Sequence, residues 1–135
     1  MEKKSKRELA FLYIYSQEFL KQNSKNQVKI FLDSNEIEDA KSREYVKEIA
    51  NGLKEYNEEI NKIISDNLKT GWTIERISTI DLALLKLAIY EIKYKKIPFK
   101  IVINEIVEYA KIYGEDSAAS FINGVLASVV KDINQ

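Results

Sequence analysis

The residues whose types and spacing could support acid–base chemistry are three pairs of carboxylates. The pairs are Glu58 with Glu59, Glu105 with Glu108, and Glu115 with Asp116. Histidine and cysteine are both absent, which removes the commonest general base, the commonest transition-metal ligand and the thiolate nucleophile. Each pair falls on an expected polar helix face or at a helix start, where carboxylates are usually solvated or act as caps. No phosphate-binding glycine loop, dinucleotide-binding turn, EF-hand loop or nucleophile elbow is present. The sequence therefore predicts no enzyme, no metal site and no cofactor.

A second chemical feature is a basic segment at the start of the chain. Lys3, Lys4, Lys6 and Arg7 lie close together, although Lys plus Arg and Asp plus Glu both total 21, for a net charge of zero. The overall charge therefore gives no indication of nucleic acid, whereas a local cluster can attract a polyanion. The alternative is a solvated helix end, which is what such charge runs usually are. Cations at a helix N-terminus oppose the macrodipole, so they do not serve helix stability.

Helices must position these residues, because the chain has a single proline and only four glycines and this composition favours long helices over turn-rich β structure. Residues 80–94, IDLALLKLAIYEIKY, are apolar on all sides of a helix, and the charges Asp81, Lys86 and Glu91 share no face. A helix of this kind is buried by several neighbours, and it is too short and too charged to cross a bilayer. We therefore predict an all-α fold, one domain over residues 1–135, with helix 80–94 at its centre.

Further helices are predicted over residues 4–21, from residue 28 to about 32, over 41–68, from about 99 to 113, and from about 118 onward. The segment 41–68 has heptad spacing, which leaves two alternatives: a dimeric coiled-coil seam or a bundle helix within the domain. The heptad run is too short for a sustained coiled coil and favours the bundle. Trp72, just after this segment, is predicted to plug the core, with an exposed stacking surface as the alternative.

The last two helices resemble a known family. Residues 98–126 resemble the C-terminal signature of the NusB transcription antitermination factors, and weaker similarity extends to the N-terminus. The matching residues are Pro98, Ile101, Ile103, Asn104, Glu105, Ala110, Lys111, Tyr113, Gly114, Phe121, Ile122, Asn123, Gly124, Val125 and Leu126, with Asp81, Leu84, Leu85, Leu87, Ala88, Tyr90, Glu91, Arg7, Ala10 and Tyr15 upstream. The family fold is two small helical bundles packed together, so the resemblance implies a NusB-like bundle of about seven helices around helix 80–94.

The resemblance implies a non-catalytic transcription antitermination factor. Such a factor binds single-stranded boxA RNA in the leader of ribosomal RNA operon transcripts, together with the ribosomal protein NusE, within the RNA polymerase antitermination complex. The implied phosphate-contacting residues are Lys3, Lys4, Lys6 and Arg7. Lysine lacks the bidentate fork of arginine, so this segment is expected to attract phosphates rather than to read sequence.

The family's RNA surface also includes the turn before the last helix, which maps onto Tyr113, Ser117 and Phe121. An aromatic ring can stack on an unpaired base, and core packing is the alternative for Phe121. Asn104 and Asn123 are expected to satisfy backbone groups between helices.

The implied contacts with the protein partner are Tyr15 and Asp81. Two other functions stay open: a helical interaction module or homodimer, and the NusB-like RNA-binding part of an RNA cytosine methyltransferase. The catalytic domain of such an enzyme needs a cysteine nucleophile, which this sequence lacks. No secretion signal is visible, so we expect a cytoplasmic protein with no membrane partner.

Overall fold

The computed structural model describes residues 3–20 and 27–133, and all regular structure in these ranges is helical. Six α-helices and one short 3-10 helix account for the predicted all-α fold of about seven helices. They are α1 (Lys6–Leu20), α2 (Gln27–Ser34), α3 (Ala40–Asp66), η1 (Ile74–Arg76), α4 (Thr79–Lys93), α5 (Phe99–Tyr113) and α6 (Ala118–Ile133). The predicted end of the first helix at residue 21 lies outside the described residues. None of the helices in the described ranges is long and apolar enough to cross a membrane.

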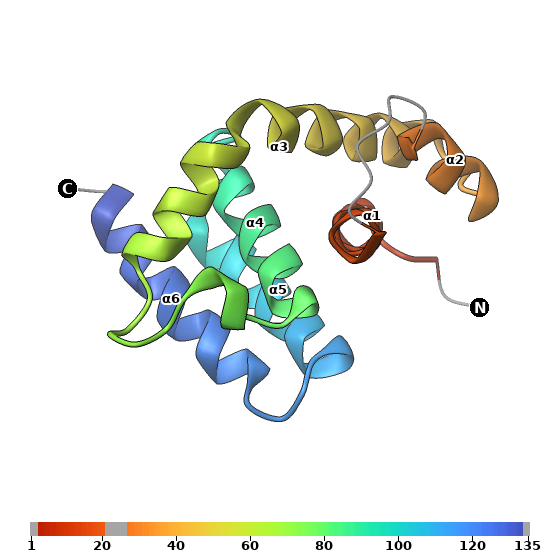
Figure 1. Ribbon diagram of the computed structural model, residues 1–135. Helices are drawn as coiled ribbons and strands as arrows, with labels where there is room; N and C mark the ends of the chain where they lie inside the picture. Colours follow the sequence, from red (N-terminus) through yellow and green to blue (C-terminus); the bar gives the residue numbers. More distant parts are fainter. Residues whose placement is uncertain (1–2, 21–26, 134–135) are drawn as a thin grey trace.

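Helix α4 is the centre of the molecule, as the sequence predicts. It packs against α1, α3, α5 and α6, and Figure 1 shows it enclosed between the arch of α3 and the α5–α6 pair. Every residue from 83 to 92 is buried, including the charged Lys86 and Glu91. The Ser78 hydroxyl caps the start of this helix by accepting a hydrogen bond from the Asp81 backbone N–H at 3.1 Å.

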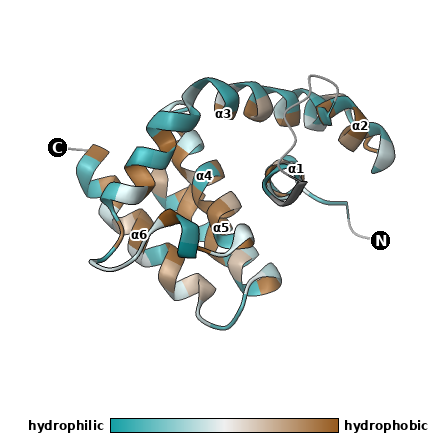
Figure 2. Cartoon of the chain, in the orientation of Figure 1, coloured by the Kyte–Doolittle hydropathy of each residue, from teal (hydrophilic) through white to brown (hydrophobic). Residues whose placement is uncertain are grey.

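The long helix α3 joins the two ends of the molecule (Figure 1). It packs against α1, α2, α4 and α6. The helical path breaks at Tyr56, whose φ of −105° and ψ of 15° are not helical. The heptad residues Val46, Ile49 and Ile60 are fully buried in this single chain, which confirms the bundle interpretation. Figure 2 shows the matching pattern, with hydrophilic residues along the outer side of α3.

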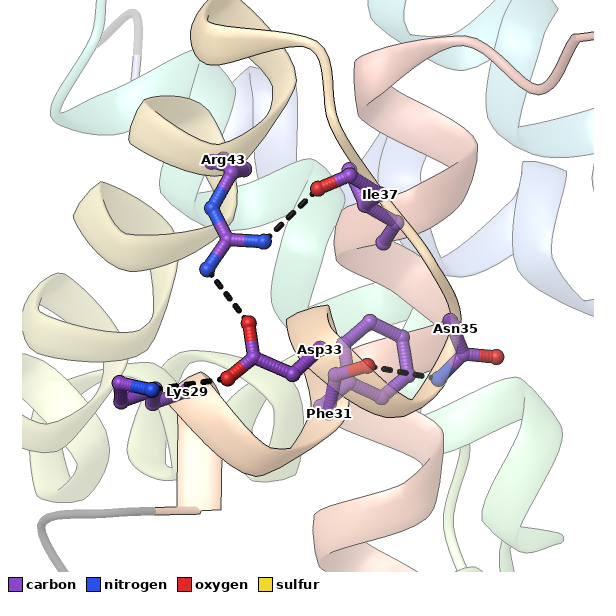
Figure 3. A network of polar contacts seen from close by, with 6 residues as sticks. All are labelled: Lys29, Phe31, Asp33, Asn35, Ile37 and Arg43. Carbon is purple, nitrogen blue, oxygen red and sulfur yellow. Dashed lines mark hydrogen bonds and ion pairs between the residues drawn. The ribbon is translucent and has the colours of Figure 1, made fainter.

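A polar network fixes the connection from α2 to α3 (Figure 3). The Arg43 guanidinium donates to the Ile37 carbonyl at 2.7 Å and to the Asp33 carboxylate at 2.9 Å. Lys29 donates to the other oxygen of Asp33 at 2.8 Å, and the hydrogen bonds from Lys29 and Arg43 lower the pKa of Asp33. The network holds α2 beside α3, where Asp39 caps the start of the long helix by accepting from the Ser42 N–H.

Close contact between α3 and α4 depends on Gly52. A Cβ added at this position would lie 2.3 Å from the Tyr90 ring. Gly52→Ala is therefore expected to lower the free energy of unfolding by about 2 kcal/mol, because overpacking displaces a buried ring. Gly124→Ala is the matched control: its added Cβ meets no atom within 4 Å, so removing a helical glycine should stabilise by up to about 1 kcal/mol. Urea unfolding of both variants tests this, and equal stabilities would contradict the packing argument.

Candidate nucleic-acid interface

The basic segment leads into α1 through a helix cap. The Ser5 hydroxyl accepts from the Glu8 N–H at 3.1 Å and also lies 2.9 Å from the Tyr109 hydroxyl on α5. Serine followed three residues later by glutamate is a sequence signal for a helix start, so the cap at Ser5 can be recognised from the sequence. The cap fixes where α1 begins, and Lys3 and Lys4 lie just before this point.

Three of the predicted phosphate contacts, Lys3, Lys4 and Lys6, have exposed side chains. The Lys3 ammonium lies 3.8 Å from the Asp39 carboxylate, and the Lys6 ammonium lies 5.0 Å from the Tyr45 ring centroid. Exposed pairs of this kind contribute little to stability, so a polyanion can displace them. We call Lys3, Lys4 and Lys6 the lysine segment.

The fourth predicted phosphate contact, Arg7, has a structural partner. Its Nε donates to the Glu91 carboxylate at 2.6 Å, and its side chain is only 17% exposed. Glu91 is fully buried and also accepts from the Tyr45 hydroxyl. Burial raises the pKa of Glu91, while the charge of Arg7 acts in the opposite direction. The Arg7 side chain therefore joins α1 to α4, a long-range pairing that spacing in the sequence does not reveal.

Tyr113 connects the lysine segment to the other predicted RNA-binding region. Its hydroxyl, at the end of α5, donates to Glu8 at 2.5 Å, and its ring lies 5.1 Å from Phe11, centroid to centroid. Burial, followed by the bond to Glu8, raises the pKa of Tyr113 to about 12, so the hydroxyl stays a donor. The first turn of α1 and the end of α5 are thus held together, whereas the contacts of Lys3 and Lys6 are with Asp39 and Tyr45 at the start of α3.

A tight turn then places Ser117 and Phe121. Gly114 ends α5 with φ −94°, which is not a left-handed conformation. Glycine is needed here because a side chain would not fit. A Cβ there would lie 2.6 Å from that of Ala118 and 2.9 Å from the Ala110 carbonyl. Ser117 is exposed, and its carbonyl accepts from the Phe121 N–H at 3.1 Å. Phe121 is therefore one helical turn beyond the exposed turn residues.

Phe121 and Trp72 form an aromatic pair at the surface. Phe121 is half-buried against the core, and its ring centroid lies 5.7 Å from that of Trp72. Trp72 is 49% exposed, so its predicted role as a core plug is wrong. The chain arrives here from a turn in which Gly71 adopts φ 90°, and this turn leaves the indole outside the bundle. The Arg76 guanidinium lies 6.0 Å from the indole centroid.

The two predicted partner-contacting residues, Tyr15 and Asp81, lie on α1 and at the start of α4. Tyr15 is half-buried, with its ring 6.3 Å from Phe11. Asp81 Oδ1 is buried without a hydrogen-bond partner, although the Asp81 backbone is capped by Ser78. Burial, with a smaller contribution from the charge of Glu115, raises the pKa of Asp81.

The prediction that Asn104 and Asn123 satisfy backbone groups between helices is wrong. Both side chains are exposed, and neither makes a hydrogen bond within the part of the chain that the structure describes. They lie instead along an open groove between α5 and α6. No group of three or more carboxylates among residues 3–20 and 27–133 is arranged to hold a metal ion.

Comparison with known proteins shows the same family over nearly the whole chain. The sequence profile of the NusB family matches residues 4–131. The transcription antitermination protein NusB of Acetivibrio thermocellus is 39% identical over 132 residues, which are 97% of this chain and 90% of that protein. The fold is similar to that of T. maritima NusB, with a TM-score of 0.83, 30% identity, and coverage of 97% of this chain and 94% of that one.

A further similar structure is a crystal structure of the antitermination factors NusB and NusE in complex with dsRNA. It matches with a TM-score of 0.84 and 27% identity, and the match covers 94% of each chain. The family profile, the curated relative and these structures agree with the motifs of α4, α5 and α6, and the chain belongs to the NusB family.

Proposed function

We propose that this protein is a non-catalytic antitermination factor that binds boxA RNA of ribosomal RNA leader transcripts together with NusE. It acts within the RNA polymerase antitermination complex, in the cytoplasm. The observation that carries the proposal is the likeness, over 94% of this chain, to a structure in which NusB and NusE are bound to RNA. The lack of histidine and cysteine is consistent with binding rather than catalysis.

The RNA is proposed to contact two parts of one surface. The lysine segment attracts phosphates through point charges, and Arg7 contributes to the same positive field while its Nε holds Glu91. The second part comprises Tyr113, Ser117 and the aromatic pair Trp72 and Phe121. Because the bond from Tyr113 to Glu8 holds α5 beside α1, one single strand can cross from the lysines to the turn. The rings then offer stacking faces to its unpaired bases.

NusE is proposed to contact the surface that includes Tyr15 and Asp81. Asp81 is partly exposed at the start of α4, so its carboxylate can accept a hydrogen bond from NusE there. Asp81→Ala is expected to weaken NusE binding at least tenfold, because a charge-assisted hydrogen bond is worth about 1.5–3 kcal/mol. Isothermal titration with purified NusE measures the effect. RNA affinity without NusE should be unchanged, and an Asp81 variant with normal NusE affinity would contradict this contact.

The proposed function is tested with a boxA RNA oligonucleotide and a scrambled oligonucleotide of the same composition. Fluorescence anisotropy should show tighter binding of boxA, and a further gain in affinity when NusE is added. Equal affinity for both RNAs, with no gain from NusE, would contradict the proposal. A fixed moderate salt concentration is needed throughout, because phosphate attraction depends steeply on salt.

A further inference from the structure

A second group of lysines lies in the turn between α4 and α5. Lys95 and Lys96 follow shortly after the end of α4, and the RNA contacts proposed above do not include them. Lys96 is exposed, and the Lys95 side chain is 24% exposed. We call Lys95 and Lys96 the turn lysines.

Tyr45 on α3 connects the turn lysines to the lysine segment. The ammonium groups of Lys6 and Lys95 each lie 5.0 Å from the Tyr45 ring centroid, so they lie within about 10 Å of each other. This distance is about one Debye length at 0.1 M salt, so both charges can attract the same polyanion. Tyr45 itself is buried, and it therefore holds the two cations near each other without offering a face to a base.

The carboxylates beside these cations do not neutralise all of them. Burial raises the pKa of Glu91, whereas the charges of Arg7, Lys95 and Lys6 lower it, so three cations act on one buried carboxylate. Arg7 donates to that carboxylate at 2.6 Å. Lys95 also pairs with Glu48 at 2.5 Å, but the Glu48 side chain is 44% exposed, and a phosphate can displace a partner of this kind. The three cations thus outnumber the two carboxylates that pair with them.

The backbone of Lys96 is in a conformation that favours glycine. Its φ is 57°, and the N–H of Ile97 donates to the Glu91 carbonyl at 3.1 Å, which closes the end of α4. Glycine is the usual residue at such a position, because a side chain crowds a left-handed backbone. A cation near this end of a helix is favourable, but Lys93 and Lys95 already supply one. Helix stability therefore does not explain a lysine at position 96, and an unfavourable residue of this kind points to function.

The first turn of α1 lies between the turn lysines and the proposed stacking residues. Glu8 and Lys6 are two residues apart, so they point about 200° apart around α1. Glu8 accepts from Tyr113 on α5, while Lys6 lies over Tyr45 on α3. A strand bound at the lysine segment can therefore continue in either direction.

We propose that the turn lysines bind phosphates of the nucleotides that flank boxA on one side. The RNA backbone then continues from the lysine segment across Tyr45 to Lys95 and Lys96. This inference rests on the proposed function, which places boxA RNA on the lysine segment. Lysines attract phosphates as point charges, so the flanking nucleotides can have any sequence.

The test compares boxA RNA alone with boxA RNA that carries a short oligouridine tail at its 5′ or its 3′ end. Two further phosphate contacts should steepen the slope of log affinity against log salt by about 1.4 for one of the tailed RNAs. Lowering the salt from about 200 to about 50 mM should then strengthen its binding about sevenfold more than that of boxA alone. In the combined Lys95→Gln, Lys96→Gln variant the tail should give no gain. Lys62→Gln with Lys131→Gln, at exposed positions on α3 and α6, is the matched control and should keep the full gain.

Lys96→Gly separates a role in binding from a role in the fold. It should lose part of the gain from the tail while raising the midpoint of urea unfolding, because glycine accepts the left-handed backbone. A lower midpoint would show that Lys96 serves the fold and would overturn the proposal.

No gain from either tail would also overturn the proposal, as would a full gain in the Lys95/Lys96 variant. The affinity of the unaltered protein for boxA alone, against a scrambled RNA, is measured separately. Failure of the proposed function would appear in that comparison, whereas failure of this inference would appear only in the effect of the tails.

Discussion

Replacing Arg7 with alanine is expected to lower the free energy of unfolding by about 3 kcal/mol. The substitution removes the group that donates to Glu91 at 2.6 Å and leaves a fully buried carboxylate that keeps the hydrogen bond from the Tyr45 hydroxyl and only the more distant charges of Lys95 and Lys6. Breaking a buried pair from one side is far more costly than breaking an exposed pair. Urea unfolding monitored by circular dichroism measures the change.

The pH dependence of the Arg7→Ala effect follows from the raised pKa of Glu91. In the folded state this carboxyl binds a proton more readily than in the unfolded chain. Its ionisation therefore destabilises the fold as pH rises from the ordinary glutamate range through the folded pKa. Without Arg7 the folded pKa rises further, so the loss should be largest near neutral pH and should shrink in acid. Lys4→Ala is the exposed control and should change stability by less than about 0.5 kcal/mol.

Glu91→Gln in the Arg7→Ala background should recover part of the lost stability, because it removes the unpaired buried charge. If Arg7→Ala leaves stability unchanged at neutral pH, the Arg7–Glu91 pair does not hold α1 to α4. In that case the whole guanidinium is available to phosphates. The Arg7 variant is therefore a poor probe of RNA contact by itself, since any loss of binding would follow a loss of folded protein.

Combining Trp72→Ala with Phe121→Leu is expected to weaken boxA binding about one hundredfold. Stacking of one base on an aromatic side chain contributes about 1–3 kcal/mol, and tenfold in affinity corresponds to about 1.4 kcal/mol. Leucine at position 121 keeps the half-buried apolar contact with the core but has no stacking face. Trp72 is 49% exposed, so alanine there should cost little stability.

Trp72→Phe is the conservative control and should retain most of the affinity. The slope of affinity against salt should stay the same in the aromatic variants, because no phosphate contact is removed. Anisotropy titrations at several salt concentrations separate the two effects. Unchanged boxA affinity in the double variant would show that the pair does not stack on RNA.

The central helix and the family could be predicted from the sequence because both depend on local patterns. Residues 80–94 are apolar on every side, and such a helix has to be enclosed whatever its neighbours are. The motifs of α5 and α6 are contiguous strings of residues, so they can be recognised without knowing what they contact. The heptad spacing of α3 leaves a bundle helix and a dimer seam both open, and the short length of the heptad run is what favours the bundle.

The positions of single side chains could not be predicted where partners are distant in the sequence. Arg7 looks like one more cation of the basic segment, because its partner Glu91 lies on another helix. The sequence predicts that Trp72 plugs the core, with an exposed stacking surface as the alternative, and the left-handed Gly71 leaves the indole at the surface. Asn104 and Asn123 both match the family motifs, but a motif does not say whether a residue serves the fold or a partner.

The most direct test of RNA binding by this surface is the salt dependence of boxA affinity. It should be measured for the unaltered protein and for the triple variant Lys3→Gln, Lys4→Gln, Lys6→Gln. Each phosphate contact with single-stranded RNA contributes about 0.7 to the slope of log affinity against log salt. Removing three contacts should therefore flatten the slope by about two and weaken binding at low salt, with stability unchanged. An identical slope and affinity in the triple variant would contradict the proposal that the lysine segment binds the RNA.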